Sequence, residues 1–172
     1  MTSPLDARPI VVAVAGPNGA GKTTFYAAHL ERVGLRFVNA DDLARELEVD
    51  AYEAAEVAKQ LREVLVAQGE SFVFETVFSD PVGDKLEFLR RASARGYTVV
   101  LCFIGLDSPE LCDERVAMRV LQGGHDVPTE KLARYPRTLE NLARAIRELP
   151  HVLVFDNSAL LEPFREVALP WP

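Results

Sequence analysis

The residues with the most specific chemical pattern in this chain form a glycine-rich loop near its start. Residues 16–23 read Gly-Pro-Asn-Gly-Ala-Gly-Lys-Thr and match G-x-x-x-x-G-K-[ST] at every fixed position. The loop follows an apolar stretch, 10–15, and precedes a segment of helical period. Glycines in this context let backbone N–H groups surround phosphate oxygens, and the following helix directs its positive end toward them. The loop therefore predicts binding of a nucleoside triphosphate.

Two side chains of this loop have expected roles of their own. Lys22 is expected to reach the β- and γ-phosphate oxygens, and Thr23 to offer its hydroxyl to Mg²⁺. No Asn-Lys-x-Asp guanine signature occurs in the chain, so the sequence favours ATP over GTP. The complete set of expected nucleotide-binding residues is Gly16, Pro17, Asn18, Gly19, Ala20, Gly21, Lys22, Thr23 and Thr24.

Two aspartates follow the second apolar stretch, 36–38. Ligands of open α/β sheets bind beyond the carboxyl ends of the strands, so side chains there can meet a second substrate. Asp41 is expected to accept or orient the proton of an incoming hydroxyl group. Helix capping and a favourable charge in the first helical turn are the competing interpretation, to which we assign Asp42. Asn39, just before them, is expected to contact the acceptor.

A carboxylate also ends the third apolar stretch, 71–75. Glu75 follows Phe-Val-Phe, where a charge is avoided unless it has a task or a partner. Two roles are open for it: a hydrogen bond to the acceptor hydroxyl, or help in holding Mg²⁺ through water. Thr76, the next residue, is assigned to the acceptor site as well.

Arginines are frequent in the last third of the chain. Arg115 and Arg119 are four residues apart and share one helical face, and Arg134 follows a glycine-containing turn, 123–128, that includes a histidine, His125. We expect a helical lid over approximately 109–137 that brings guanidinium groups to the transferred phosphate, with His125 hydrogen-bonding within it. The competing interpretation is a solvated, ion-paired helix surface, so only these three arginines are assigned to catalysis.

Apolar, β-branched stretches alternate with segments of helical period, which is typical of βα units around a parallel sheet. We therefore expect an α/β, three-layer sandwich around a central, mostly parallel five-stranded sheet, with Pro136 kinking or splitting the last helix. The predicted strands are 10–15, 36–38, 71–75, 97–104 and 152–156, and the predicted helices are 22–31, 41–47, 51–68, 82–95, 109–121 and 130–148.

Composition limits the classes of protein that this chain can represent. Its 172 residues, 48% of them apolar, suit a single domain over 1–172 with a real core. With 26 acidic against 19 basic residues the chain is not expected to bind nucleic acid broadly, which disfavours a polynucleotide end kinase. No secretory leader or membrane-length apolar stretch is seen, so we expect a cytoplasmic protein without membrane contact. Cys102 and Cys112 are expected to be buried, reduced thiols.

These motifs together resemble the zeta-toxin family of P-loop kinases, which includes UDP-N-acetylglucosamine kinases. The matching segments are 16–24, Asn-Ala-Asp-Asp-Leu at 39–43, Phe-Glu-Thr at 74–76, and 115–142 with its His-Asp-Val-Pro sequence. The resemblance implies a P-loop kinase-like fold, an ATP-dependent phosphorylation of a hydroxyl group with Asp41 as base, and phosphate-binding arginines at Arg115, Arg119 and Arg134. A partner antitoxin is implied by this family analogy alone.

The sequence therefore predicts a kinase that uses ATP and Mg²⁺ to phosphorylate a small-molecule hydroxyl, with UDP-N-acetylglucosamine as the first candidate acceptor. A kinase of another small metabolite is the alternative within enzymes. A nucleotide-dependent binding or switch module is the alternative outside them.

Overall fold

The computed structural model describes residues 4–123 and 134–167 of the chain. Within these residues one six-stranded sheet has the order β2-β3-β1-β4-β5-β6, with every neighbouring pair parallel except β5 and β6. Its strands are β1 (Ile10–Ala15), β2 (Arg36–Val38), β3 (Phe72–Thr76), β4 (Thr98–Gly105), β5 (Val152–Asp156) and β6 (Arg165–Val167).

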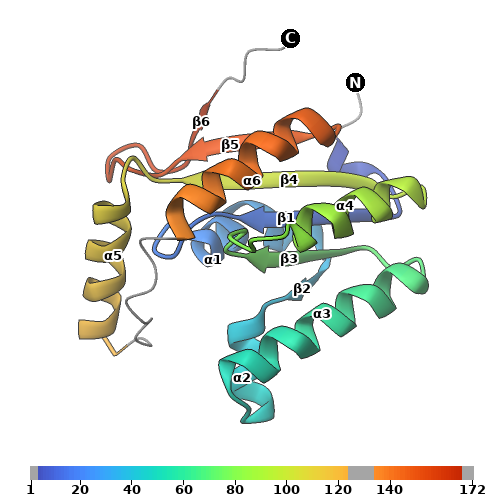
Figure 1. Ribbon diagram of the computed structural model, residues 1–172, viewed down its shortest axis with the longest axis horizontal. Coiled ribbons are helices and arrows are strands. Elements are labelled where there is room, and N and C mark those ends of the chain that lie inside the picture. Colours follow the sequence, from blue (N-terminus) through green and yellow to red (C-terminus); the bar gives the residue numbers. More distant parts are fainter. Residues whose placement is uncertain (1–3, 124–133, 168–172) are drawn as a thin grey trace.

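Helices cover both faces of this sheet, which gives the expected three layers (Figure 1). The α-helices are α1 (Lys22–Phe25), α2 (Ala40–Leu47), α3 (Ala51–Ala67), α4 (Asp84–Ala94), α5 (Pro109–Leu121) and α6 (Arg134–Glu148). Shorter helical turns are η1 (Pro4–Asp6), η2 (Tyr26–Leu30) and η3 (Glu31–Val33). The α/β, P-loop kinase-like architecture predicted from the sequence is confirmed.

Alternating side chains of β1 enter two separate cores, because successive residues of a strand point to opposite faces. Val11 and Ala13 pack with residues of α3, α4 and α6, whereas Val12 and Val14 pack with Phe25 and neighbours from α1, η2 and the start of α5. All six residues of β1 are buried, as expected for a central strand covered by helices on both faces.

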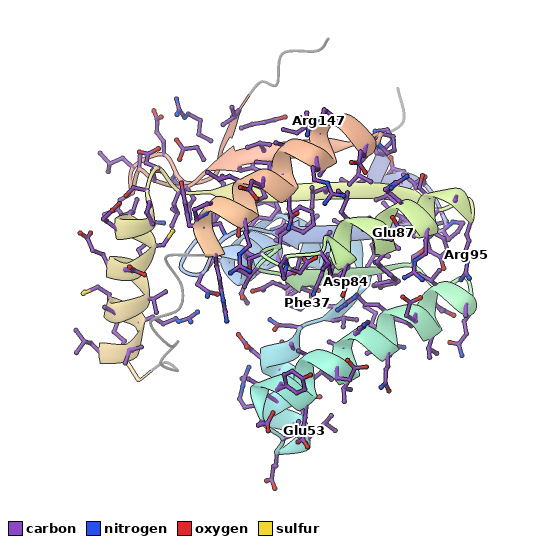
Figure 2. The ribbon with its side chains drawn as sticks, viewed as in Figure 1. Phe37, Glu53, Asp84, Glu87, Arg95 and Arg147 are labelled. Carbon is purple, nitrogen blue, oxygen red and sulfur yellow. The ribbon has the colours of Figure 1, made fainter. Side chains whose placement is uncertain are left out.

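Local signals explain where several helices begin. The Ser108 hydroxyl accepts a hydrogen bond from the Leu111 N–H at 3.2 Å, with Pro109 at the first helical position, as its sequence predicts. Glu53, Asp84 and Glu87 lie in the first turns of α3 and α4, where their charge complements the helix dipole (Figure 2).

The structure corrects two expectations about the elements. The sheet has six strands in the described residues, not five, because the short, exposed β6 pairs with β5 in an antiparallel direction. The helix expected over 22–31 is α for only its first turn and continues as the wider turns of η2. Pro136 is the third described residue of α6, and the part of the expected helix before Arg134 lies outside the described residues, so the effect of this proline on the helix stays a prediction.

Candidate functional site

The glycine-rich loop leaves β1 at its carboxyl end and lies between β3, β4 and α5. The Gly16 N–H donates to the Thr76 carbonyl at 3.3 Å, and a Cβ atom on Gly16 would lie 2.1 Å from the Ile104 carbonyl oxygen. A Cβ atom on Gly19, whose φ is +79°, would lie 2.8 Å from the Cys112 carbonyl oxygen. Only glycine at these positions allows the backbone to approach its neighbours this closely.

Lys22 is the buried cation of this loop. Its ammonium group donates to the Pro17 carbonyl at 3.1 Å and lies 3.9 Å from the Glu75 carboxylate. Burial lowers the pKa of Lys22, and the negative charges of Glu75 and Asp41 oppose that change. The loop therefore holds a desolvated positive charge on Lys22, which the carboxylate of Glu75 compensates only in part.

The carboxylate of Glu75 connects the loop with α2. It accepts a hydrogen bond from the Thr23 hydroxyl at 2.8 Å and one from the Asn39 side-chain amide at 3.3 Å. Asn39 is buried and caps α2, where its side-chain oxygen accepts from the Asp41 N–H at 2.9 Å. The five residues Lys22, Thr23, Asn39, Asp41 and Glu75 thus meet at the carboxyl ends of β1, β2 and β3, as their sequence positions predict.

The two aspartates of α2 differ in their surroundings. Asp41 lines the same cleft as Lys22, and its negative charge is felt at the Lys22 ammonium group. Asp42 instead forms an ion pair with Arg45, three residues further along the same helix. The structure therefore gives Asp42 a local surface partner and Asp41 a place beside the loop.

A cleft of about 990 Å³ opens beside the loop. Its walls come from the loop, from the start of α2, from one face of α3, and from the segment that joins β3 to α4. Thr76 lines it too, with its hydroxyl accepting from the Phe78 N–H at 3.1 Å. The expected acceptor residues Asn39, Asp41, Glu75 and Thr76 all border this cleft.

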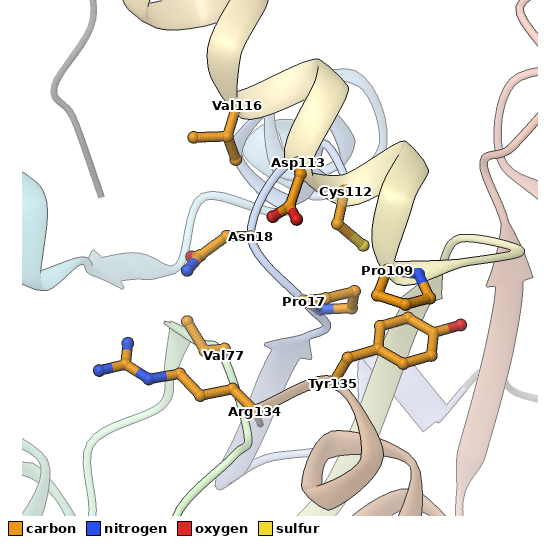
Figure 3. Close-up of a pocket in the computed structure, with 9 residues that line it drawn as sticks. All are labelled: Pro17, Asn18, Val77, Pro109, Cys112, Asp113, Val116, Arg134 and Tyr135. Atoms are coloured by element: carbon orange, nitrogen blue, oxygen red, sulfur yellow. The ribbon is translucent and has the colours of Figure 1, made fainter. Parts of the chain in front are cut away.

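The arginines assigned to catalysis do not share one environment. Arg134, the first residue of α6, lines the large cleft and also a small cavity of about 20 Å³ between the loop, α5 and α6 (Figure 3). Arg119 is exposed on α5, and its positive charge is among the influences that lower the pKa of Lys22. Arg115 donates to the Ser158 carbonyl at 3.1 Å, which ties α5 to the loop after β5. Arg137 lines the cleft beside Arg134.

One residue not named above supports the loop, and two expected residues lie away from the cleft or outside the described part of the chain. The Asn157 side chain donates to the Ala20 carbonyl at 2.8 Å and accepts from the Phe164 N–H, so it supports the loop from behind. Thr24 is exposed on α1. His125 and most of the turn 123–128 lie outside the described residues, and the lid over 109–137 stays a prediction.

Cys102 and Cys112 are buried free thiols, and burial raises their pKa values to about 12 and about 11.

Among the charged cleft residues that the sequence did not single out, Arg62 and Asp80 have covered polar atoms. Arg62 is buried on α3, and Asp80 follows β3 with both carboxylate oxygens covered and without a hydrogen bond among the described residues. The sequence carries a signal for Arg62, because Ala54, Ala58 and Leu65 place it on the apolar stripe of its helix. Asp80 lies in a loop and has no comparable pattern.

Comparison with solved structures shows the same fold in several proteins. The chain superimposes on a shikimate kinase from Bacteroides thetaiotaomicron with a TM-score of 0.54 at 19% identity, covering 89% of each chain. A structure of the PezAT chromosomal toxin-antitoxin system of Streptococcus pneumoniae matches with a TM-score of 0.65 at 18% identity, covering 87% of this chain and 68% of that one. A structure of AvrRxo1-ORF1:-ORF2 with ATP matches with a TM-score of 0.66 at 20% identity, covering 90% of this chain and 57% of that one.

Sequence comparison gives the family. No curated protein sequence matches the chain. No helix among the described residues is long and apolar enough to cross a bilayer. The AAA domain family matches residues 11–142, which include β1, the glycine-rich loop and the cleft described above. This chain therefore belongs to the AAA domain family, within the P-loop fold that small-molecule kinases share.

Proposed function

We propose that this protein is an ATP-dependent phosphotransferase that moves the γ-phosphate to a hydroxyl group of a small molecule bound in the 990 Å³ cleft. The observation that carries the proposal is that one cleft is lined both by Lys22 of the phosphate loop and by Asp41 at the end of β2. A nucleotide-binding module without chemistry needs the first of these groups and not the second.

The residues of the loop are suited to a bound triphosphate. The positive φ values of Gly19 and Gly21 turn the backbone around the space before α1, and Lys22 brings a buried positive charge to it. Thr23 and Glu75 are the residues that would hold Mg²⁺, directly or through water, and the ion would neutralise charge on the β- and γ-phosphates. Their mutual hydrogen bond favours the metal-side role for Glu75 over contact with the acceptor.

The transfer itself requires a base, an electrophile and a leaving group. The acceptor oxygen forms a bond to the γ-phosphorus, the bond from that phosphorus to the bridging oxygen breaks, and ADP leaves. Asp41 takes or orients the hydroxyl proton, while Lys22 and the guanidinium groups of Arg119 and Arg134 stabilise the charge on the phosphoryl oxygens. Arg115, bound to the Ser158 carbonyl, is suited to holding α5 beside the loop.

UDP-N-acetylglucosamine is the first candidate acceptor. The zeta-toxin resemblance supports it, and a structure of a toxin-antitoxin system is among the structural matches. The cleft volume is at the upper end of the range of about 300–1,000 Å³ typical of ligand pockets, which leaves room for a nucleotide sugar. The match to a shikimate kinase supports the alternative of another small hydroxylated metabolite. A protein antitoxin is a further proposal that rests on the toxin-antitoxin match alone.

The test is phosphate transfer from ATP to a panel of UDP-sugars, free sugars, hydroxy acids and nucleosides. We expect Asp41→Asn to lower kcat by about 100-fold or more and to leave the Kd for ATP unchanged, since a positioned base contributes about 10²–10⁴-fold. Asp42→Asn is the matched control and is expected to keep the wild-type rate, because Asp42 is paired with Arg45 and does not line the cleft. Transfer that survives Asp41→Asn would contradict the assigned base. ATP binding without transfer to any acceptor would favour a switch module.

A further inference from the structure

A buried arginine that has no ion-pair partner among the described residues lies in the wall of the cleft. Arg62 is 8% exposed, and its guanidinium carbon lies 4.9 Å from the Phe74 ring centroid and 5.6 Å from that of Phe88. The two rings come from β3 and α4, so the guanidinium group is held between three elements. Phe74 and Phe88 meet each other edge to face with their centroids 5.8 Å apart, so both contact the guanidinium group from one side. Contact of this kind leaves the N–H edges of a guanidinium group available for hydrogen bonds.

Those edges have no partner within the described residues. Arg62 makes no hydrogen bond and no ion pair there; its Nε atom is covered, and the residue, which keeps a small exposed fraction, lines the cleft. Burial lowers the pKa of Arg62, and the charges of Glu63 and Glu56 on the same helix oppose this. Both glutamates are engaged elsewhere, Glu63 with Arg91 at 2.6 Å and Glu56 with Gln60 at 3.2 Å.

A buried cation of this kind is costly unless something compensates its charge. Further charged side chains that line the cleft include Glu56 and Lys59 on α3, Asp84 and Lys85 on α4, and Asp80 in the loop before α4. None of the acids Glu56, Glu63, Asp80 and Asp84 forms an ion pair with Arg62 in the described part of the chain. Lys22, the other buried cation of the cleft, faces Glu75, so among the described residues Arg62 is the buried cation whose charge has no ion-pair partner.

We propose that the hydroxyl acceptor carries a carboxylate or phosphate group and that Arg62 binds this group through its guanidinium edge. The inference rests on the proposed function and specifies its substrate class as hydroxylated anions. The planar N–H fork of arginine matches the two oxygens of either group, which explains why an arginine occupies this apolar stripe.

The experiment compares acceptors in pairs that differ in the anionic group. The pairs are gluconate with gluconamide, glucose 6-phosphate with glucose, and UDP-N-acetylglucosamine with N-acetylglucosamine. Transfer is measured as kcat/KM, and the Kd of each compound is measured by calorimetry with the phosphate loop saturated by a non-hydrolysable ATP analogue. We expect kcat/KM for the charged member of at least one pair to exceed that for the neutral member by about 100-fold or more. A difference of this size is expected because the neutral member leaves a buried charged group of the site unpaired.

Variants of Arg62 then separate recognition from structure. Arg62→Met is expected to remove the preference while the Kd for ATP stays unchanged, and Arg62→Lys to keep only part of it, because an ammonium group lacks the planar fork. Arg91→Met, which removes an exposed arginine from α4, is the matched control and should keep the full preference. A purely structural Arg62 would instead lower the melting temperature on replacement and leave selectivity intact.

The two proposals fail in different ways. Equal transfer to charged and neutral members, or a preference that persists in Arg62→Met, overturns the anion site and leaves the phosphotransferase function standing. Absence of transfer and of acceptor binding across the whole panel overturns both. Tight calorimetric binding of a charged member without transfer supports the anion site and argues against the phosphotransferase.

Discussion

Replacing Glu75 with glutamine tests how much the stability of the nucleotide-free protein depends on the negative charge that faces Lys22. The two charged groups are 3.9 Å apart, and their side chains are only 7% and 13% exposed. At an effective dielectric constant of about 20, charges at this separation attract by about 4 kcal/mol. Glutamine can still accept from Thr23, and Lys22 keeps its bond to the Pro17 carbonyl, so part of this loss is offset.

We expect Glu75→Gln to reduce the free energy of unfolding by about 3 kcal/mol, in line with the roughly 3–5 kcal/mol lost when one member of a buried pair is removed. For a chain of this size, that corresponds to a decrease in melting temperature of about 6–12 °C. Urea unfolding followed by circular dichroism measures the first quantity, and calorimetry the second. Glu87→Gln on the outer side of α4 is the matched control (Figure 2) and should change stability by less than about 0.5 kcal/mol.

A double-mutant cycle with Lys22→Met tests the cause. If the charge pair is responsible, the two substitutions should couple by about 2 kcal/mol, and the cost of Glu75→Gln should shrink at high pH, where neutral Lys22 needs no counter-charge. A coupling below about 0.5 kcal/mol, or a cost that does not depend on pH, would refute the reasoning.

Two further predictions concern the loop. Burial lowers the pKa of Lys22, so between that lowered pKa and 10.5 the folded protein binds fewer protons than the unfolded chain. The free energy of unfolding should therefore rise with pH through this window. A pH series of urea titrations should show this rise in the wild type and a flatter one in Lys22→Met. Gly16→Ala should cost more than about 3 kcal/mol and abolish ATP binding, because its Cβ atom would lie 2.1 Å from the Ile104 carbonyl oxygen. Gly69→Ala, whose φ of +74° is also positive but whose Cβ atom would have open space around it, should cost only about 1 kcal/mol and leave ATP binding unchanged, as thermal unfolding and calorimetry can show.

Most of the elements were predictable because their signals are local. Apolar runs marked the five strands β1 to β5, and helical spacing marked the helices to within a few residues. β6 carries no such signal, since its three residues are exposed and it forms only by pairing with β5. The change from α1 to the wider turns of η2 also depends on distant contacts, among them the stacking of Tyr26 on Phe37 at 3.8 Å.

By itself the sequence determined the phosphate loop, the fold class and the gathering of Asn39, Asp41 and Glu75 at one edge of the sheet. These follow from the chain direction, because parallel strands bring their carboxyl ends to the same side. Only the tertiary structure decided which charges meet. It paired Thr23 with Glu75, gave Asp42 a surface partner, and placed Arg62 against two aromatic rings with no ion-pair partner among the described residues. Whether a charge is compensated depends on groups far apart in the chain, and no local pattern of residues encodes that.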